Sequence, residues 1–266
     1  MKLAFVFPGQ GSQAVGMLDG FASSPSVQAL LGQADAALGE PLSTLIARGP
    51  AETLALTVNT QPAMLAAGYA CWLAWRDAGG PAPAAVAGHS LGEYTALTVA
   101  GAFDVGDALR LVRVRAQAMQ EAVPVGQGGM AAILGLDDDK VRQACREAAG
   151  EAPGEVVEPA NYNAPAQVVI AGHKAAVERA CERARALGAK RAMPLAVSAP
   201  FHSSLLRPAG ERLAQALASV ELRAPQVPLV NNVDVAIETE LARIRDALVR
   251  QSYGPVRWVE VVQRLK

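Results

Sequence analysis

The best candidate for a reactive residue is Ser90, which lies between two glycines in the run Gly88-His89-Ser90-Leu91-Gly92. An apolar stretch at 83–87 predicts a buried strand before it, and a helix is expected from about 93 to 101. A G-x-S-x-G turn between a strand and a helix is typical of a nucleophile elbow, because glycines permit the close approach that the turn needs. The structural alternative is a serine that only caps the helix.

A serine nucleophile needs a base, and the chain has three histidines, His89, His173 and His202. His89 adjoins Ser90, so its side chain is expected to point elsewhere and to pack or brace the loop. His173 is expected to cap a helix or lie at the surface. His202 follows Pro200-Phe201 in a loop that returns to the main domain, where catalytic side chains are common. We therefore predict His202 as the base.

No carboxylate stands out as the third member of a catalytic triad. The acidic residues between Ser90 and His202 include Asp104, Asp107 and the run 137–139, and none has a setting that distinguishes it. A backbone carbonyl that accepts from the Nδ1–H group can orient a histidine instead.

A cation is predicted in the core at Arg115. With 100° per residue, this arginine lies at the centre of the apolar face of a helix expected over 105–123. The neighbours on that face are Ala108, Leu111, Val112, Ala118 and Met119. Because an uncompensated buried charge is unfavourable, Arg115 either forms an ion pair with a core carboxylate or holds a carboxylate of the substrate. The second alternative would select a dicarboxylic acyl group.

The loop from Gly9 to Ala14 fits G-x-G-x-x-G/A, a pattern also found in dinucleotide-binding proteins. No second strand ending in an acidic residue follows at the required distance, since 28–38 has helical periodicity. We therefore interpret the loop as a tight turn, or as one that presents a backbone N–H to an oxyanion together with the amide of Leu91.

Composition excludes several classes of protein. The 266 residues are 51% hydrophobic and 5% aromatic, and 24 Lys and Arg nearly balance 25 Asp and Glu. This balance argues against nucleic-acid and membrane-surface binding. The longest apolar stretch, 63–75, is too short to span a bilayer. The separated histidines and the three cysteines without a C-x-x-C spacing predict no metal site, no disulfide framework and a reducing cytoplasm.

The expected elements define an α/β fold with an insert. A strand at 3–7 and helices at 27–38, 63–78 and 105–123 belong to the larger domain, 1–126 and 198–266. Between them, strands are expected at 130–136, 156–162, 167–171 and 192–198, and helices at 137–149 and 174–187, with a turn at 163–165. This β-α-β-β-α-β order is that of a ferredoxin-like unit, which we place at 127–197.

The sequence resembles the malonyl-CoA:acyl carrier protein transacylases, the acyltransferases of fatty-acid synthesis, over essentially its whole length. The motifs occur in family order. They are Phe7 to Gln13, Gln61-Pro62-Ala63, Gly88 to Tyr94, Arg115, Asn161-Tyr162-Asn163, Pro200-Phe201-His202 and Asn231-Asn232-Val233. The fold that the resemblance implies is an α/β-hydrolase-like large domain with an inserted ferredoxin-like small subdomain. The family usually continues past the region of Trp258 with a strand and a terminal helix, whereas this sequence stops at Lys266, either as a naturally short form or because its end is omitted.

The resemblance also implies roles for residues of the site. Ser90 would be the acylated nucleophile, His202 its base and Arg115 the ligand of the free malonyl carboxylate. Backbone N–H groups of Gln10 and Leu91 would form the oxyanion hole.

Two further roles come from the same resemblance. Gln251 would orient His202 through its main-chain carbonyl, which would replace the missing acid. Phe201 would crowd an α-methyl branch and so select malonyl over larger acyl groups.

We therefore expect a cytoplasmic, monomeric enzyme that transfers malonyl from malonyl-CoA to acyl carrier protein without a metal or cofactor. Three alternatives stay open at the level of sequence. They are a transacylase of another malonyl pathway (malonate decarboxylation or polyketide synthesis), a serine thioesterase, and a binding module with an inactive site. Lys190 and Arg191 are either a contact for an acidic carrier protein or a solvated surface.

Overall fold

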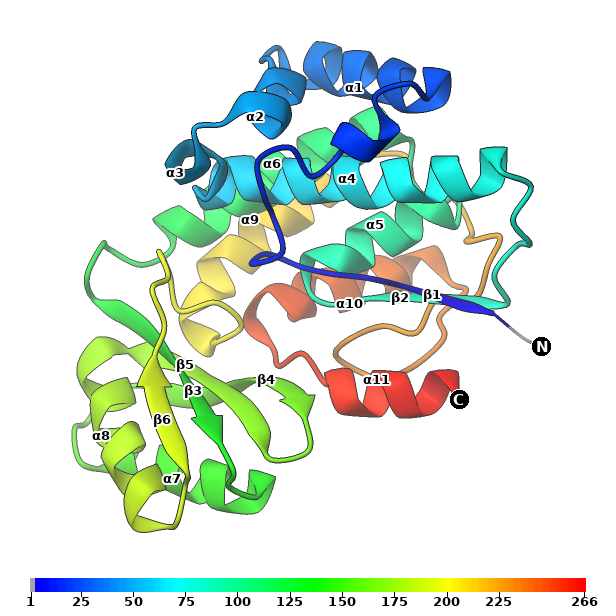
Figure 1. Ribbon diagram of the computed structural model, residues 1–266. Coiled ribbons are helices and arrows are strands. Elements are labelled where there is room, and N and C mark those ends of the chain that lie inside the picture. The colour runs from blue at the N-terminus through cyan, green and yellow to red at the C-terminus, as the bar shows by residue number, and fades with distance from the viewer. Residues whose placement is uncertain (1–2) are drawn as a thin grey trace.

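The computed structural model describes residues 3–266, which form an α/β fold in two parts (Figure 1). The large unit, residues 3–127 and 198–266, is built around the parallel strands β1 (Ala4–Phe7) and β2 (Ala85–Gly88). The segment near Leu229 extends this sheet, because it forms a parallel bridge with Val86 on the other side of β2. The small unit, residues 128–197, lies below the large one in Figure 1.

Helices enclose the parallel strands. One apolar core contains residues of β1 and β2 and of α1 (Pro25–Leu38), α4 (Thr57–Asp77), α5 (Leu91–Val99) and α6 (Val105–Glu121). The same core includes residues of α9 (Arg207–Ala218) and α10 (Leu241–Tyr253). The terminal helix α11 (Trp258–Leu265) packs in a separate cluster through Val261 against Ala87 and Val230. The strand–turn–helix β2–α5 is thereby held from both sides, as in an α/β-hydrolase-like core.

The small unit has the predicted β-α-β-β-α-β order. Its strands are β3 (Gly128–Leu134), β4 (Val157–Ala164), β5 (Gln167–His173) and β6 (Arg191–Pro194), arranged β4-β5-β3-β6 with all pairs antiparallel. The helices α7 (Asp138–Gly150) and α8 (Lys174–Ala186) contribute to one core with these strands. That core contains only residues between Ala131 and Ala192 among its buried members.

Several boundaries differ from the sequence predictions. Helix α4 begins at Thr57 rather than near Pro62, which lies inside the helix, because the preceding turn is fixed by burial of Thr57, Thr60 and Gln61. Strand β4 continues to Ala164, so the turn falls at Pro165-Ala166, where Ala166 has a φ of 58°. Strand β6 ends at Pro194, which has no N–H to continue the ladder.

Other elements carried no predicted assignment. They are α2 (Leu42–Arg48), α3 (Ala51–Leu54), the short 3-10 helices Asp19–Phe21 and Ser204–Leu206, and the three helices α9, α10 and α11. Among residues 3–266, none of the helices combines the length and the apolar character needed to cross a bilayer. The same residues contain no group of three His, Cys, Asp or Glu side chains placed to hold a metal ion.

Candidate active site

Ser90 occupies the predicted elbow between β2 and α5. Its φ of 53° lies in the left-handed region, which residues other than glycine rarely adopt. The two flanking glycines are required by space, since a Cβ at Gly88 would lie 1.9 Å from the Gly92 carbonyl carbon and one at Gly92 would lie 2.1 Å from the Phe7 oxygen. The elbow therefore places the Ser90 side chain at the N-terminus of α5, at the edge of a pocket.

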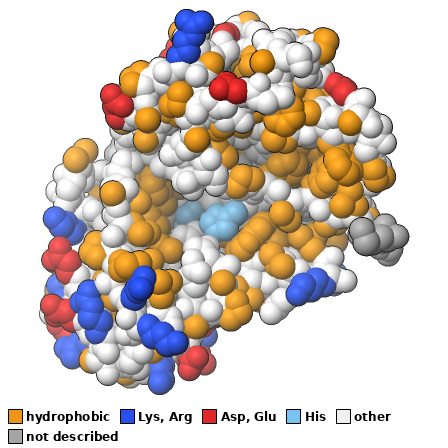
Figure 2. Space-filling model, in the orientation of Figure 1, with side chains coloured by type: hydrophobic (Ala, Val, Ile, Leu, Met, Phe, Trp, Pro, Cys, Tyr) orange, Lys and Arg blue, Asp and Glu red, His pale blue; other side chains and the backbone are white. Residues whose placement is uncertain are grey.

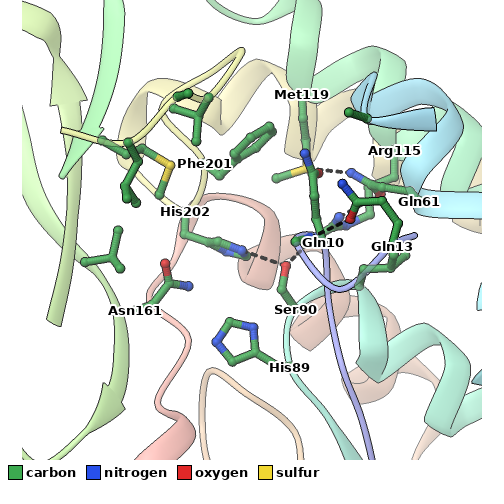
Figure 3. Close-up of a pocket in the computed structure, with 18 residues that line it drawn as sticks. Gln10, Gln13, Gln61, His89, Ser90, Arg115, Met119, Asn161, Phe201 and His202 are labelled. Atoms are coloured by element: carbon green, nitrogen blue, oxygen red, sulfur yellow. Dashed lines mark hydrogen bonds between the residues drawn. The ribbon is translucent and has the colours of Figure 1, made fainter. Parts of the chain in front are cut away.

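His202 and Ser90 are in hydrogen-bond contact, with 2.7 Å between Nε2 and Oγ (Figure 3). On the other side of the ring, Nδ1 lies 2.8 Å from the main-chain oxygen of Gln251. Because a carbonyl can only accept, Nδ1 carries the proton and Nε2 accepts from the Ser90 hydroxyl. The histidine chosen by elimination is thus the one beside Ser90, and a carbonyl of α10 takes the position of a triad acid.

His202 is buried, and its burial and the nearby Arg115 charge together lower its pKa to about 3, although the Gln251 carbonyl opposes the shift. The imidazole is therefore neutral near pH 7 and able to accept a proton. The two other histidines make contacts with residues other than Ser90. His89 Nε2 is 2.8 Å from Asn163 Oδ1 and its ring contacts Trp258, whereas His173 Nδ1 accepts from the Val156 amide.

Arg115 lies in the core as predicted, with 2% of its surface exposed. Its guanidinium donates to three neutral oxygens. They are Gln61 Oε1 at 2.8 Å, Gln251 Oε1 at 2.9 Å and Ser90 Oγ at 3.1 Å. No carboxylate among residues 3–266 lies within ion-pair distance of it, so the direct ion pair considered from the sequence is absent from this part of the chain. The buried cation thus faces the candidate nucleophile without an anionic partner in contact.

Ser90, His202 and Arg115 line a pocket of about 310 Å³ between the two units. In the space-filling view it is a hollow with histidine at its floor and apolar side chains on its rim (Figure 2). The large unit contributes the polar floor. The small unit contributes a largely apolar wall, made of Met130, Asn161, Val169, Leu195, Ala196 and Val197. Phe201 and Met119 also line the pocket beside His202 and Arg115 (Figure 3).

Gln10 and Leu91 line the same pocket, next to Ser90. Leu91 is the first residue of α5, so its amide has no acceptor within the helix. Neither the Leu91 nor the Gln10 amide donates a hydrogen bond to another of the described residues. Two unpaired N–H groups beside Ser90, of which that of Leu91 is at the N-terminus of α5, are suited to bind a negatively charged oxygen.

Asn232 holds the elbow in place, although sequence reasoning gave it no role. Its Oδ1 accepts from the Ser90 amide at 2.7 Å and its Nδ2 donates to the Gly88 oxygen at 2.8 Å. Gln61, the acceptor for Arg115, was likewise quoted only as part of a motif. Both are buried polar residues in regions without clear periodicity, and the motifs were the only signal for them.

The geometry defines an acyl-transfer type of site, and comparison with known proteins agrees. The family model described as acyl transferase domain matches residues 4–264, so the chain belongs to the acyl transferase family.

The similar proteins carry a more specific name. The chain is 56% identical over 263 residues to malonyl CoA-acyl carrier protein transacylase of Salmonella typhimurium, covering 98% of this chain and 84% of that protein. It matches the crystal structure of an acyl-carrier-protein S-malonyltransferase from Burkholderia pseudomallei with a TM-score of 0.97 and 63% identity, covering 100% of this chain and 85% of that one. A complex of a type II PKS acyl-carrier protein with its malonyl-transacylase matches with a TM-score of 0.95 and 52% identity, over 99% and 84% of the two chains.

Proposed function

We propose that this protein transfers the malonyl group from malonyl-CoA to the phosphopantetheine thiol of acyl carrier protein, in fatty-acid biosynthesis. The observation that carries the proposal is the position of Arg115, whose Nη2 lies 3.1 Å from Ser90 Oγ and which no carboxylate of the described part of the chain contacts. A malonyl ester on Ser90 has a free carboxylate one carbon away from the ester carbonyl. Arg115 is placed to bind that carboxylate through charge-assisted hydrogen bonds.

In the first half-reaction, His202 Nε2 accepts the Ser90 hydroxyl proton as Oγ attacks the thioester carbonyl. The Gln10 and Leu91 amides stabilise the oxyanion of the tetrahedral intermediate. The bond to sulfur then breaks, and the His202 imidazolium donates its proton to the departing thiolate of coenzyme A. Malonyl stays on Ser90 as an ester.

In the second half-reaction, the pantetheine thiol of acyl carrier protein takes the place of coenzyme A. His202 removes its proton, and the thiolate attacks the ester carbonyl carbon. The bond from that carbon to Ser90 Oγ then breaks, malonyl leaves as the thioester of acyl carrier protein, and the His202 imidazolium returns the proton to Oγ. We propose that Gln251 orients His202 throughout, by its carbonyl. Both half-reactions use only side chains and amides of this chain, so the proposed reaction needs no metal and no cofactor.

Selection of the acyl group is proposed to depend on Arg115 and Phe201. Arg115 fixes the carboxylate and so holds the ester away from an attacking water. Phe201, which lines the pocket beside His202, would crowd an α-methyl branch. A serine thioesterase would transfer the acyl group of the Ser90 ester to water, whereas a transferase passes it to a thiol. The extent of hydrolysis therefore distinguishes the two.

We further propose that residues 127–197 are a subdomain inserted into a catalytic domain formed by 1–126 and 198–266, and that the protein acts as a monomer in the cytoplasm. The separate core of the small unit supports the division. Free cysteines at 71, 145 and 181 are compatible with a reducing compartment. Lys190 and Arg191, both exposed on the small unit, are proposed contacts for an acidic carrier protein rather than for nucleic acid.

Intact mass after exposure to malonyl-CoA tests the proposal. The wild-type protein should gain one malonyl group, lose it on addition of holo-acyl carrier protein, and release little free malonate. The Ser90→Ala variant should gain none. An adduct on Ser90→Ala would exclude Ser90 as the nucleophile, and predominant release of malonate would indicate a thioesterase.

A malonyl transacylase of polyketide synthesis is the second candidate, because one of the similar structures is described as a complex with a type II PKS acyl-carrier protein. The chemistry on Ser90 is the same in both cases. Transfer rates to carrier proteins of the two pathways, measured with the same malonylated enzyme, separate them.

A further inference from the structure

Only two side chains of the Asp, Glu, Lys and Arg types are buried among residues 3–266, Arg115 at 2% and Glu93 at 1% exposure. Glu93 lies on α5, three residues after Ser90, and the reaction described above gives it no task. Two opposite charges in one core are normally in contact, because an isolated buried charge is strongly unfavourable. These two form no direct ion pair.

The side-chain amide of Gln251 lies between the two charges. Its Oε1 accepts from Arg115 Nη2 at 2.9 Å, and its Nε2 donates to Glu93 Oε2 at 3.1 Å. Nε2 also donates to the Ser90 main-chain oxygen at 2.8 Å. The amide is therefore oriented with its oxygen toward the cation and its nitrogen toward the anion, so that its dipole links the two.

We propose that Glu93 is a positioning residue that balances the charge of Arg115 across the Gln251 amide, which leaves the guanidinium without a carboxylate partner and so available to a carboxylate of the substrate. A carboxylate in direct contact would occupy the donors that the substrate needs. The amide keeps the balancing charge close while only one donor of Arg115 is engaged with it. The inference rests on the proposed role of Arg115 in binding the malonyl carboxylate.

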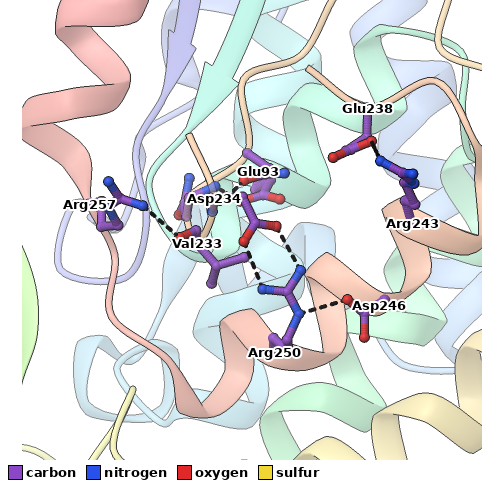
Figure 4. Close-up of polar contacts among 10 residues, drawn as sticks. Glu93, Val233, Asp234, Glu238, Arg243, Asp246, Arg250 and Arg257 are labelled. Atoms are coloured by element: carbon purple, nitrogen blue, oxygen red, sulfur yellow. Dashed lines mark hydrogen bonds and ion pairs between the residues drawn. The ribbon is translucent and has the colours of Figure 1, made fainter. Parts of the chain in front are cut away.

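The surroundings of Glu93 favour this pairing over others. The main-chain N–H of Asn232 donates to the same Oε2 at 2.9 Å, which fixes the carboxylate beside Gln251. The two other acidic residues near it have surface partners of their own, Asp234 with Arg250 at 2.6 Å and Glu238 with Arg243 at 3.9 Å (Figure 4). Burial raises the pKa of Glu93 to about 7, while Gln251, Asn232 and Arg115 oppose the rise.

A double-mutant cycle in thermal unfolding tests the coupling, at about pH 8.5, where Glu93 is ionised. In Arg115→Met, Glu93 is left without its balancing charge, and we expect the unfolding temperature to fall. Adding Glu93→Gln should raise it again, by at least about 5 °C more than Glu93→Gln changes the wild-type protein. Glu238→Gln is the matched control and should combine additively with Arg115→Met. Additive effects of Glu93→Gln would overturn the proposal.

A second measurement serves where Arg115→Met does not fold. Malonylation should stabilise Glu93→Gln more than it stabilises the wild-type protein, because the malonyl carboxylate supplies the missing negative charge. Acetylation, which brings no charge, should stabilise both equally. An equal malonyl effect in both proteins would contradict the proposal. Absence of any malonyl adduct on the wild-type protein would refute the proposed function, whereas the unfolding cycle would still decide the role of Glu93.

Discussion

The two units of the molecule meet at one pocket but contribute different things to it. The large unit provides every group that we place in the reaction, with His202 Nε2 at 2.7 Å and Arg115 Nη2 at 3.1 Å from Ser90 Oγ. The small unit provides a wall in which Asn161 is the only polar residue. This wall contains no nucleophile and no base. The difference indicates that the large unit carries the chemical step and binds the acyl group, whereas the small unit adds apolar contacts to the substrate.

The largest effect should follow from removing the base. His202→Ala should reduce the rate of malonyl-enzyme formation at least about 10³-fold, because Ser90 loses its proton acceptor. Single-turnover acylation followed by rapid quenching measures this. His89→Ala is the matched control in the same pocket, since His89 contacts Asn163 rather than Ser90, and it should lose far less. Equal losses would mean that the Ser90–His202 contact does not carry the reaction.

The next effect separates binding of the carboxylate from the chemistry. Arg115→Met should lower kcat/KM for malonyl-CoA about 10²–10³-fold more than for acetyl-CoA, because acetyl has no carboxylate and a buried charge pair is worth about 3–5 kcal/mol. The ratio of the two kcat/KM values is the quantity to measure. A ratio unchanged from wild type would make Arg115 a structural residue only.

Changes in the wall of the small unit should be smaller and of another kind. Val169→Ala should raise KM for malonyl-CoA about 3- to 10-fold, because an apolar contact with the substrate is lost. The acylation rate at saturation should stay within about threefold of wild type, since no reacting group is touched. Steady-state and single-turnover kinetics together separate the two constants. A loss confined to the saturating rate would break the division between the units.

The smallest effect concerns stability and pH. The folded-state pKa of Glu93, about 7, lies above its ordinary value of 4.5. Its contribution to stability is therefore present at low pH and is lost as the pH rises through 7, by about 3 kcal/mol. Unfolding temperatures from pH 5.5 to about 8.5 should fall more for the wild-type protein than for Glu93→Gln. Parallel curves for the two proteins would show that the folded-state pKa of Glu93 is not raised by its burial.

Short-range sequence patterns were enough to predict much of the fold and the position of the Ser90 elbow. Residue periodicity placed the small unit and the buried face of α6, because both depend on neighbours in sequence. The elbow at Ser90 was visible since glycine spacing reports a local steric need. Helices α9 to α11 had no predicted assignment, and α4 was expected to begin too late, because their limits are decided by what they pack against.

The hydrogen bonds that connect the residues of the site could not be predicted from short-range sequence patterns. Asn232 reaches the Ser90 amide across 142 residues, and Gln251 reaches Glu93 across 158. Such contacts depend on how loops and helices are brought together, which the spacing of residues does not encode. The resemblance to a family supplied Gln251 as a partner of His202 but gave no role to its side chain.

The most direct test of the account is a crystal structure of the malonylated enzyme. We predict that the malonyl carboxylate lies within hydrogen-bond distance of the Arg115 guanidinium, with the ester oxygen facing the Gln10 and Leu91 amides and Gln251 still between Arg115 and Glu93. A carboxylate that points to solvent, with Arg115 bonded only to Gln61, Gln251 and Ser90 as in the free enzyme, would contradict it.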